Sequence, residues 1–326
     1  MPLVVAHSPA EWTARFGASP TAVTVGNFDG VHLGHREILA AVIERARRTG
    51  VIAAAVTFDP HPVKVLRPDT APALLTTLAQ RLALLEEQQL DAALVLRFDP
   101  ALAALSPEDF AERVLVTTLH ARAVFVGGNF RFGHRQAGDV TLLTKLGYRL
   151  GFEVISLPPV VRRGMVISSS SIRASVAEGR MSAAARFLGR PFSLAGTISP
   201  ETGTGRRLVV PTLNLSTDQE LLPRRGVYAT ETLLDGRPFH SVTNVGFRPT
   251  FDGKRLAIES HLLDFSAERT SGPMEIRFCT RLRDEQKFAG PDELRAQIQR
   301  DIRRATVFFR RLDGFRRAGY PHRPGV

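Results

Sequence analysis

From residue 21 to residue 158, short apolar runs alternate with amphipathic segments. The runs Thr21 to Gly26 and Val51 to Phe58 are nearly all apolar, which is typical of parallel strands covered on both faces. Between them, residues 36–48 carry apolar side chains at helical spacing, and Gly50 follows as a helix stop. Strands that alternate with helices predict an α/β fold with a parallel sheet, in which ligands lie beyond the carboxyl ends of the strands.

The alternation continues with the same two kinds of segment. It predicts further helices over residues 76–90 and from the cap Ser106 onward, and further strands over residues 91–98, 123–127 and 152–157.

After about residue 190 the pattern becomes one of short strands. Strand-like runs cover residues 192–198, 227–234, 239–245, 256–265 and 274–280, and Asp235-Gly236 between two of them predicts a hairpin. Helical spacing returns only from Pro291, with an apolar stripe of Leu294, Ile298, Ile302, Ala305, Phe309 and Leu312. This half therefore predicts an antiparallel barrel or sandwich closed by one helix. We place the domain boundary between residues 188 and 189, giving domains 1–188 and 189–326.

Composition narrows the function classes. The formal charge of +11 can indicate a nucleic-acid binder, but much of the excess is arginine between Arg300 and Arg323, and a solvated helix face is the commoner explanation. With no base-reading motif, we expect no nucleic-acid partner. We also expect no membrane span, because about 18 consecutive apolar residues are nowhere found. The single cysteine, Cys279, excludes an intrachain disulfide and fits the cytoplasm.

The segment Gly26 to His35 joins the first predicted strand to the first predicted helix. Its glycines allow close approach of a ligand to the backbone, and His32 and His35 share a face of the first helical turn. Free backbone N–H groups and the positive end of the helix dipole point the same way. The segment predicts a phosphate site in which preorganised donors stabilise charge on the α-phosphate of ATP. The candidate ATP-binding residues here are Gly26, Asn27, Phe28 and Gly34.

A second candidate phosphate clasp lies at residues 167–173, ahead of another predicted helix. The hydroxyl groups of Ser168 and Ser169 and the charge of Arg173 suit the β- and γ-phosphates. Two further loops follow predicted strands and combine aromatic with polar residues, which suits a flat ring system. They supply Asp59 and His61, and Asn129 and Phe130, as candidate residues for binding such a ring.

The second half lacks a P-loop of the form Gly-x-x-x-x-Gly-Lys-[Ser/Thr]. It offers instead a Gly-rich segment ending at Gly205, a candidate ATP contact, and then Pro211-Thr212-Leu213-Asn214. Thr212 and Asn214 share a face if that segment is extended, and their oxygens are plausible hard ligands for Mg²⁺. Glu259, on a predicted strand, is a candidate general base for a hydroxyl nucleophile. Taken alone, each of these features has an equally good structural explanation, with Asn214 as a turn residue and Glu259 as an exposed strand residue.

Together these motifs resemble those of the bacterial bifunctional riboflavin kinase and FAD synthetase family. The resemblance rests on residues 26–35, 57–62, 128–133 and 167–173 in the first half, and on residues 211–214, 226–228, 244–250 and 259–265 in the second. It implies a Rossmann-like nucleotidylyltransferase sheet followed by an antiparallel β-barrel of the riboflavin kinase type, closed by a long helix. It also implies riboflavin, ATP, FMN and FAD as the small-molecule partners, with Mg²⁺ accompanying ATP.

By this resemblance, the barrel would phosphorylate riboflavin, with Glu259 as base and with Thr212 and Asn214 on the metal. The N-terminal domain would then transfer AMP from ATP to FMN. His32 and His35 would stabilise the α-phosphate, Ser168, Ser169 and Arg173 would hold the leaving pyrophosphate, and Asn129 would lie by the flavin or its phosphate.

Two alternatives remain beside this interpretation. The chain has Val209-Val210 before Pro211, where the family usually has a glycine and an aromatic residue, and Pro200-Glu201 in place of a usual His-Gly. Because of these departures, an FAD synthetase whose barrel binds flavin without kinase activity stays open as an alternative. The other alternative is a nucleotidylyltransferase that acts on a different phosphate ester.

Overall fold

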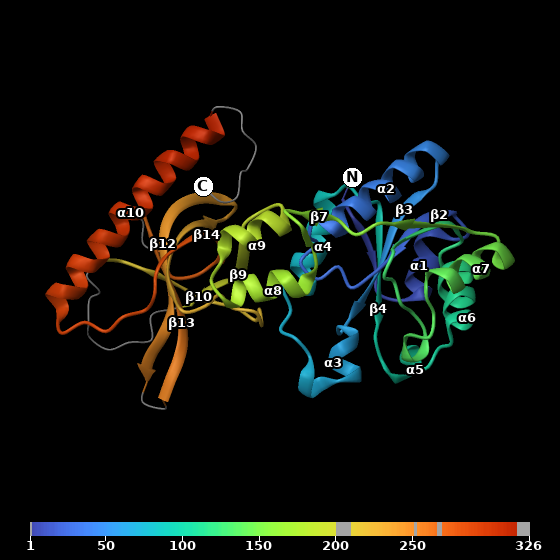
Figure 1. Ribbon diagram of the computed structural model, residues 1–326, viewed down its shortest axis with the longest axis horizontal. Coiled ribbons are helices and arrows are strands. Elements are labelled where there is room, and N and C mark those ends of the chain that lie inside the picture. Colours follow the sequence, from blue (N-terminus) through green and yellow to red (C-terminus); the bar gives the residue numbers. More distant parts are fainter. Residues whose placement is uncertain (1, 200–209, 251–252, 266–268, 318–326) are drawn as a thin grey trace. The chain divides into compact units, whose positions relative to one another are not determined.

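The computed structural model describes residues 2–199, 210–250, 253–265 and 269–317, and Figure 1 shows their arrangement along the chain. Contacts divide the chain into two compact units, residues 1–168 and 169–326. Helices α8 (Ser169–Ala177) and α9 (Met181–Leu188) fall in the second unit, whereas the sequence analysis assigned them to the first domain.

The first unit is built on a parallel sheet of six strands in the order β1-β4-β3-β2-β5-β6. The strands are β1 (Val4–Ala6), β2 (Thr21–Val25), β3 (Ile52–Asp59), β4 (Ala92–Arg97), β5 (Ala121–Gly127) and β6 (Glu153–Leu157). The main helical segments are α1 (Pro9–Phe16), α2 (Leu33–Thr49), α4 (Leu78–Glu87), the π-helical η2 (Ala111–Thr118) and α7 (Val140–Leu150). The shorter elements are α3 (Pro62–Leu66), η1 (Pro68–Thr70), α5 (Pro100–Ala103), α6 (Pro107–Phe110), η3 (His134–Gln136) and the hairpin β7 (Val161–Arg162) with β8 (Met165–Val166). The predicted parallel α/β fold is confirmed.

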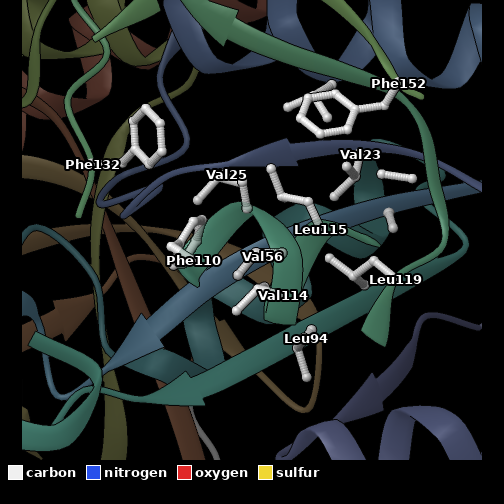
Figure 2. Packing of buried hydrophobic residues seen from close by; sticks show 14 of the residues in the cluster. Val23, Val25, Val56, Leu94, Phe110, Val114, Leu115, Leu119, Phe132 and Phe152 are labelled. Atoms are coloured by element: carbon white, nitrogen blue, oxygen red, sulfur yellow. The ribbon is translucent and has the colours of Figure 1, made fainter. Parts of the chain in front are cut away.

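Strand β3 shows why the sheet is covered on both faces. Ala54 and Val56 point into a cluster with Trp12 and Phe110, whereas Ala53 and Ala55 point into a second cluster beneath α2 and α4. Figure 2 shows the first cluster, where Val56 and Leu94 of neighbouring strands lie beside Val114 of η2. Successive side chains of a strand alternate between faces, so a strand buried on both faces reads as one continuous apolar run.

The sheet order fixes where a ligand crevice forms. From β2 the chain continues to β3 on one side, and it later returns to β5 on the other side of β2. The topological switch point therefore lies between the carboxyl ends of β2 and β5, where doubly wound sheets bind their ligands. The loop that carries His32 and His35 follows β2, and the loop that carries Asn129 and Phe130 follows β5.

The second unit contains a closed antiparallel barrel in the order β10-β13-β12-β11-β14-β9. Its strands are β9 (Phe192–Ser199), β10 (Leu213–Ser216), β11 (Gly226–Leu234), β12 (Arg237–Thr250), β13 (Gly253–Leu262) and β14 (Pro273–Arg283). Asp235 and Gly236 form the predicted two-residue hairpin turn, with φ of 49° and 79°, as a type I′ turn requires. The barrel and its closing helix α10 (Pro291–Arg317) are thus confirmed.

Part of the barrel interior is filled by hydroxyl groups. Thr230 Oγ1 lies 2.8 Å from Ser241 Oγ and 2.6 Å from Thr243 Oγ1, and Thr232 Oγ1 lies 2.8 Å from Ser260 Oγ. All five side chains are fully buried, and their mutual hydrogen bonds offset the cost of removing them from water. The side chains of the intervening residues, such as Glu231, point outward.

Helix α10 packs on that outer face of the barrel. Ala305 and Phe309, two members of the predicted stripe, are buried against Ala229. A bidentate ion pair joins Arg316 to Glu231 of β11, with the shorter bond at 2.6 Å. The predicted apolar stripe therefore serves packing, and the arginines on the opposite side of the helix face solvent.

Cys279 lies at the edge of this helix–barrel contact, and burial raises the pKa of its thiol to about 12. Because only the thiolate reacts, we expect alkylation at pH 8 to be slower than that of an ordinary cysteine by on the order of a thousandfold. The rate should keep rising through pH 10, where an ordinary thiol, already ionised, has levelled off. Mass spectrometry of timed iodoacetamide labelling measures this, with urea-unfolded chain as the control. Rapid labelling of the folded chain at pH 8 would show that the helix leaves the thiol accessible.

Candidate functional site

The two histidines lie side by side at the start of α2. His32 is the N-cap of the helix and accepts a hydrogen bond from the backbone N–H of His35, with a distance of 3.3 Å from Nδ1 to N. The rings stack with centroids 3.7 Å apart and an interplanar angle of 13°. An added Cβ at Gly34 would lie 3.1 Å from His32 Cε1, so glycine leaves room for this stack. The predicted pairing of the two imidazoles at a helix start is confirmed.

Electrostatics favours an uncharged His35. Burial, the neighbouring His32 and the charge of Arg81 each lower the pKa of His35, and together they hold it well below its usual value. Phe28 packs its ring edge against His35 at a centroid distance of 5.2 Å and is itself buried. A neutral imidazole still carries one N–H donor, which is what stabilisation of a phosphoryl oxygen needs.

The glycine-rich loop is held in place by Asp29, a residue that the sequence analysis did not single out. The Asp29 carboxylate is 1% exposed and accepts hydrogen bonds from the backbone N–H groups of Leu75 and Thr76, each at 3.1 Å. Thr76 in turn accepts from the Gly30 N–H through its hydroxyl group at 3.1 Å. The loop that carries the histidines is therefore fastened to the segment that enters α4.

Arg81 of α4 is a second residue that the sequence analysis missed. Its side chain is 1% exposed, and Nη1 donates to Thr57 Oγ1 at 3.0 Å and to the Phe58 carbonyl at 2.9 Å. The signal was present in the sequence, because Arg81 precedes Leu84 and Leu85 at helical spacing and so occupies the apolar face of its helix. An arginine on a core-facing stripe indicates a buried cation with a specific task.

The loop after β3 carries two of the predicted flavin-binding residues. Asp59 is exposed at the end of the strand, and His61 is 5% exposed and caps α3 by accepting from the Val63 N–H at 3.2 Å. Both lie at the carboxyl edge of the sheet, as the prediction placed them.

The loop after β5 is fixed by several backbone contacts. Asn129 is exposed at its tip, and the rings of Phe130 and Phe132 stack with centroids 5.5 Å apart. Phe132 exchanges two backbone hydrogen bonds with Gly138, at 2.9 and 3.1 Å, and its ring lies in the core. The loop thus offers an exposed amide and a half-buried aromatic ring from a rigid base.

The residues of the second predicted phosphate clasp fall at the limit between the two units. Ser168 ends the first unit, and Ser169 and Arg173 belong to α8 in the second. The serine run begins the helix instead of preceding it. The contact of these residues with ATP phosphates stays a prediction.

In the barrel, strand register places three polar residues in one row, and two of them, Asn214 and Glu259, are predicted site residues. Asn214 of β10 pairs with Glu259 of β13, and Glu259 pairs in turn with Asn244 of β12. Residues directly opposite on neighbouring strands project their side chains to the same face. His261 Nδ1 lies 2.8 Å from the Pro211 carbonyl and fixes the chain just before Thr212. A carboxylate therefore lies between two amides on one face of the barrel.

The donors of the predicted metal site fit a hard cation. Among the residues that the structure describes, Thr212 Oγ1 is buried without a hydrogen-bond partner, and so is the Asn214 amide atom assigned as Nδ2. The oxygen and nitrogen of an asparagine amide are interchangeable by a flip of the group, so a carbonyl oxygen fits this position equally well. Gly205, the remaining predicted ATP contact, lies outside the described residues.

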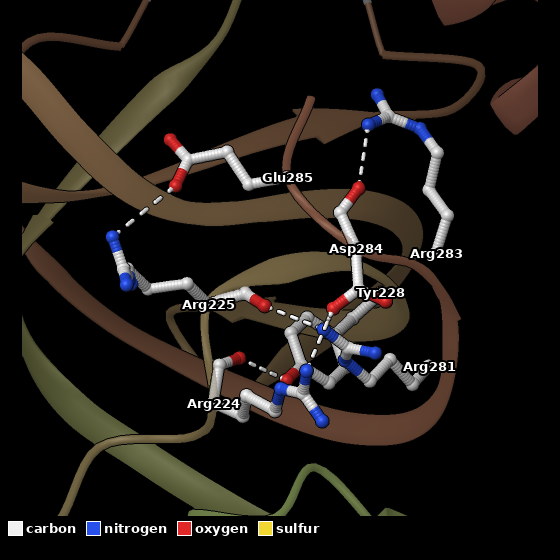
Figure 3. A network of polar contacts seen from close by, with 7 residues as sticks. All are labelled: Arg224, Arg225, Tyr228, Arg281, Arg283, Asp284 and Glu285. Atoms are coloured by element: carbon white, nitrogen blue, oxygen red, sulfur yellow. Dashed lines mark hydrogen bonds and ion pairs between the residues drawn. The ribbon is translucent and has the colours of Figure 1, made fainter. Parts of the chain in front are cut away.

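A polar network joins the residues around the start of β11 to the end of β14 and the segment after it, as Figure 3 shows. The Arg281 guanidinium donates to the Arg225 carbonyl and to Asp284, both at 2.6 Å, and the Tyr228 hydroxyl donates to the Arg224 carbonyl. An added Cβ at Gly246 would lie 2.5 Å from Glu285 Oε1. The segment after β14 is therefore held close to the strand that carries Asn244.

The fold and these two sites define a class of protein. A doubly wound sheet with paired histidines at the helix after β2, followed in the chain by a closed barrel with a carboxylate–amide row, defines a two-part nucleotide-using enzyme.

Comparisons with known proteins identify the family. The FAD synthetase family matches residues 17–171, and the riboflavin kinase family matches residues 188–309. The chain is 38% identical over 288 residues to the bifunctional riboflavin kinase/FMN adenylyltransferase of Escherichia coli K12, which covers 88% of this chain and 92% of that protein. The enzyme of that name from Pseudomonas fluorescens is 38% identical over 285 residues, which is 87% of this chain and 91% of that protein.

A crystal structure described as a macrolide-efflux protein from Streptococcus pneumoniae shares the fold. Its TM-score is 0.80 at 24% identity, over 93% of this chain and 98% of that one. The chain belongs to the family of bifunctional riboflavin kinase/FMN adenylyltransferases. Kinases and nucleotidyltransferases of these families generally use ATP with a divalent metal. No helix within the described part of the chain is long and apolar enough to cross a membrane.

Proposed function

We propose that the chain makes FAD from riboflavin in two ATP-dependent steps, adenylyl transfer at the paired histidines and phosphoryl transfer at the barrel. The observation that carries the adenylyl-transfer step is the stacked His32–His35 pair beside the topological switch point of the sheet. The family membership and the Asn214–Glu259–Asn244 row support the kinase step. A cytoplasmic location is part of the proposal, because a chain with a single cysteine suits a reducing compartment.

In the kinase step, Glu259 takes the proton of the riboflavin 5′-hydroxyl group as its oxygen attacks the γ-phosphorus of ATP. The bond to the β-phosphate oxygen breaks, and FMN and ADP result. Thr212 and Asn214 would hold Mg²⁺, which neutralises charge on the ATP phosphates when it is bound. Positioning and charge stabilisation supply most of the rate in this chemistry.

In the second step, a phosphate oxygen of FMN attacks the α-phosphorus of a second ATP, and pyrophosphate leaves. His32 and His35 donate hydrogen bonds to the α-phosphoryl oxygens as their negative charge grows. Ser168, Ser169 and Arg173 hold the leaving pyrophosphate. Asn129 and Phe130, with Asp59 and His61 across the crevice, bind the flavin and its phosphate.

A product assay tests the whole proposal. The purified chain is incubated with ATP and Mg²⁺, with riboflavin in one tube and FMN in the other, and the flavins are separated by chromatography. FAD in both tubes is the expected result. FAD from FMN alone would mean that the barrel binds flavin without phosphorylating it. No FAD in either tube would contradict the proposed function and favour a different phosphate ester as substrate.

We expect Gly138→Ala to weaken the flavin loop. An added Cβ there would lie 2.6 Å from the Phe132 ring, which stacks on Phe130. Overpacking of this kind costs about 1–3 kcal/mol of stability, and the displaced rings should raise the KM for FMN several-fold. Urea unfolding and steady-state kinetics measure the two effects. Gly290→Ala is the control, because its added Cβ meets no atom of the described residues within 4 Å. An unchanged KM would mean that the two rings do not contact the flavin.

A further inference from the structure

Arg81 is the most deeply buried cationic side chain in the described part of the chain, at 1% exposure. Taking an isolated charge out of water is costly, so a buried arginine persists only where hydrogen bonds and opposite charge compensate. Its helix positions it on the same face as Leu84 and Leu85, where an apolar residue would pack without this cost. The position of the charge therefore calls for an explanation beyond packing.

The compensation comes from residues that border the adenylyl-transfer crevice. Arg81 Nη1 bonds to Thr57 Oγ1 and to the Phe58 carbonyl, at the carboxyl end of β3. The carboxylates of Asp29 and Asp59 lie near enough to act on its charge. With Nη1 committed to these bonds and the side chain enclosed, Arg81 acts through its neighbours and does not contact substrate.

A chain of hydrogen bonds continues from Arg81 to the loop that carries the histidines. The Thr57 hydroxyl accepts from Arg81 and donates to the Asn27 carbonyl at 3.2 Å. The same loop is fastened on its other side where Asp29 accepts from the N–H groups that precede α4. Arg81 of α4, through Thr57, thus holds the loop at Asn27, and the residues that precede α4 hold it at Asp29.

We propose that Arg81 is a positioning residue for adenylyl transfer, which fixes the loop of His32 and His35 against the end of β3 through Thr57. The proposal rests on the function proposed above.

Arg81 also has an electrostatic effect, because its positive charge acts on the pKa of His35. The charged and titratable groups that act on His35 are His32 of its own helix and Arg81 of α4, and both lower its pKa, after burial as the largest cause. Arg81 therefore helps to keep His35 uncharged, a form that still carries one N–H donor.

Two variants separate the positioning role of Arg81 from its electrostatic effect on His35. Arg81→Met removes both the bonds and the charge, whereas Arg81→Lys keeps the charge and loses the paired bonds of the guanidinium. We expect Arg81→Met to lower kcat for FAD formation from FMN on the order of a hundredfold, as misplacement of reacting groups by about 1 Å does. Loss of the charge lets the pKa of His35 rise, so the acidic limb of its pH–kcat profile should move to higher pH. Arg81→Lys should lose about tenfold in kcat and keep the wild-type acidic limb, because the charge remains.

The control is Leu85→Ala, which removes a buried side chain one turn later on the same helix face. It should lower the melting temperature while kcat and the acidic limb stay as in the wild-type chain. FMN formation from riboflavin is a second control, because its rate should be equal in the wild-type chain and in the three variants.

An Arg81→Met chain that keeps the wild-type acidic limb, and loses no more activity than Leu85→Ala, would overturn the proposal. If Arg81→Met yields no folded protein, Arg81→Lys decides, because a wild-type kcat in that variant would refute the positioning role. Absence of FAD from the wild-type chain would instead contradict the proposed function itself.

Discussion

Replacing His32 with alanine should stop flavin conversion at FMN. Removing one donor from a site that stabilises a phosphoryl oxygen costs about 10²- to 10³-fold in kcat. FMN should then accumulate from riboflavin at the wild-type rate, because Glu259 and its neighbours belong to the other unit. Chromatography of the flavin products over time measures both reactions in one sample.

His32 also has a structural role, which the experiment must separate from its chemistry. It caps α2, and loss of an N-cap acceptor costs about 0.5–2 kcal/mol. His32→Asn is the matched control, because asparagine is a strong N-cap residue that lacks the imidazole. We expect the asparagine variant to recover the melting temperature and to remain as slow as the alanine variant in FAD formation. If asparagine restored the rate, His32 would act only as a helix cap.

Periodicity predicted the fold well because both halves bury their strands in regular ways. A parallel strand such as β3 is covered on both faces and reads as one apolar run, and α2 ends at Gly50 in the left-handed conformation that glycine favours. The hairpin at Asp235-Gly236 needs two positive φ values, and an Asp-Gly pair is a sequence that predicts them. In each case the local sequence contains the whole physical cause of the local structure.

The arrangement of the sites depends on causes that local sequence does not contain. Strand β10 is short, and its own sequence does not show which residues its polar side chains will face. The strand register decides this, because it places Asn214 opposite Glu259. Asp29 was not singled out, because the burial of its carboxylate and its bonds to residues 75 and 76 arise only in the fold. Arg81 was not singled out either, and its bonds join it to Thr57 and Phe58 of another element. Pairings between distant residues decide all three cases.

The fold also explains how one chain can carry two phosphate chemistries. In the first unit the phosphate donors are a helix start and two imidazoles, which suits charge that develops on the α-phosphate. In the barrel a carboxylate lies between amides, which suits a hydroxyl nucleophile that must lose a proton. The two reactions thus rest on different side chains, so substitutions should separate the two activities cleanly.

Glu259→Gln should therefore abolish most FMN formation and spare FAD formation. Glutamine keeps the size and shape of the side chain but does not take up the proton of the riboflavin hydroxyl group. Loss of a general base costs about 10²- to 10⁴-fold in rate. Supplied with riboflavin, the variant should form almost no FAD, and supplied with FMN it should form FAD at the wild-type rate.

The matched control is Glu275→Gln, on strand β14 of the same barrel. Glu275 pairs with Arg277 at 3.1 Å, and such a partly exposed pair contributes about 0–1 kcal/mol, so both activities should persist. Equal kinase rates in the two glutamine variants would remove Glu259 from the role of base. A loss confined to Glu259→Gln, with the melting temperature unchanged, would assign the proton transfer to the carboxylate that strand register sets between Asn214 and Asn244.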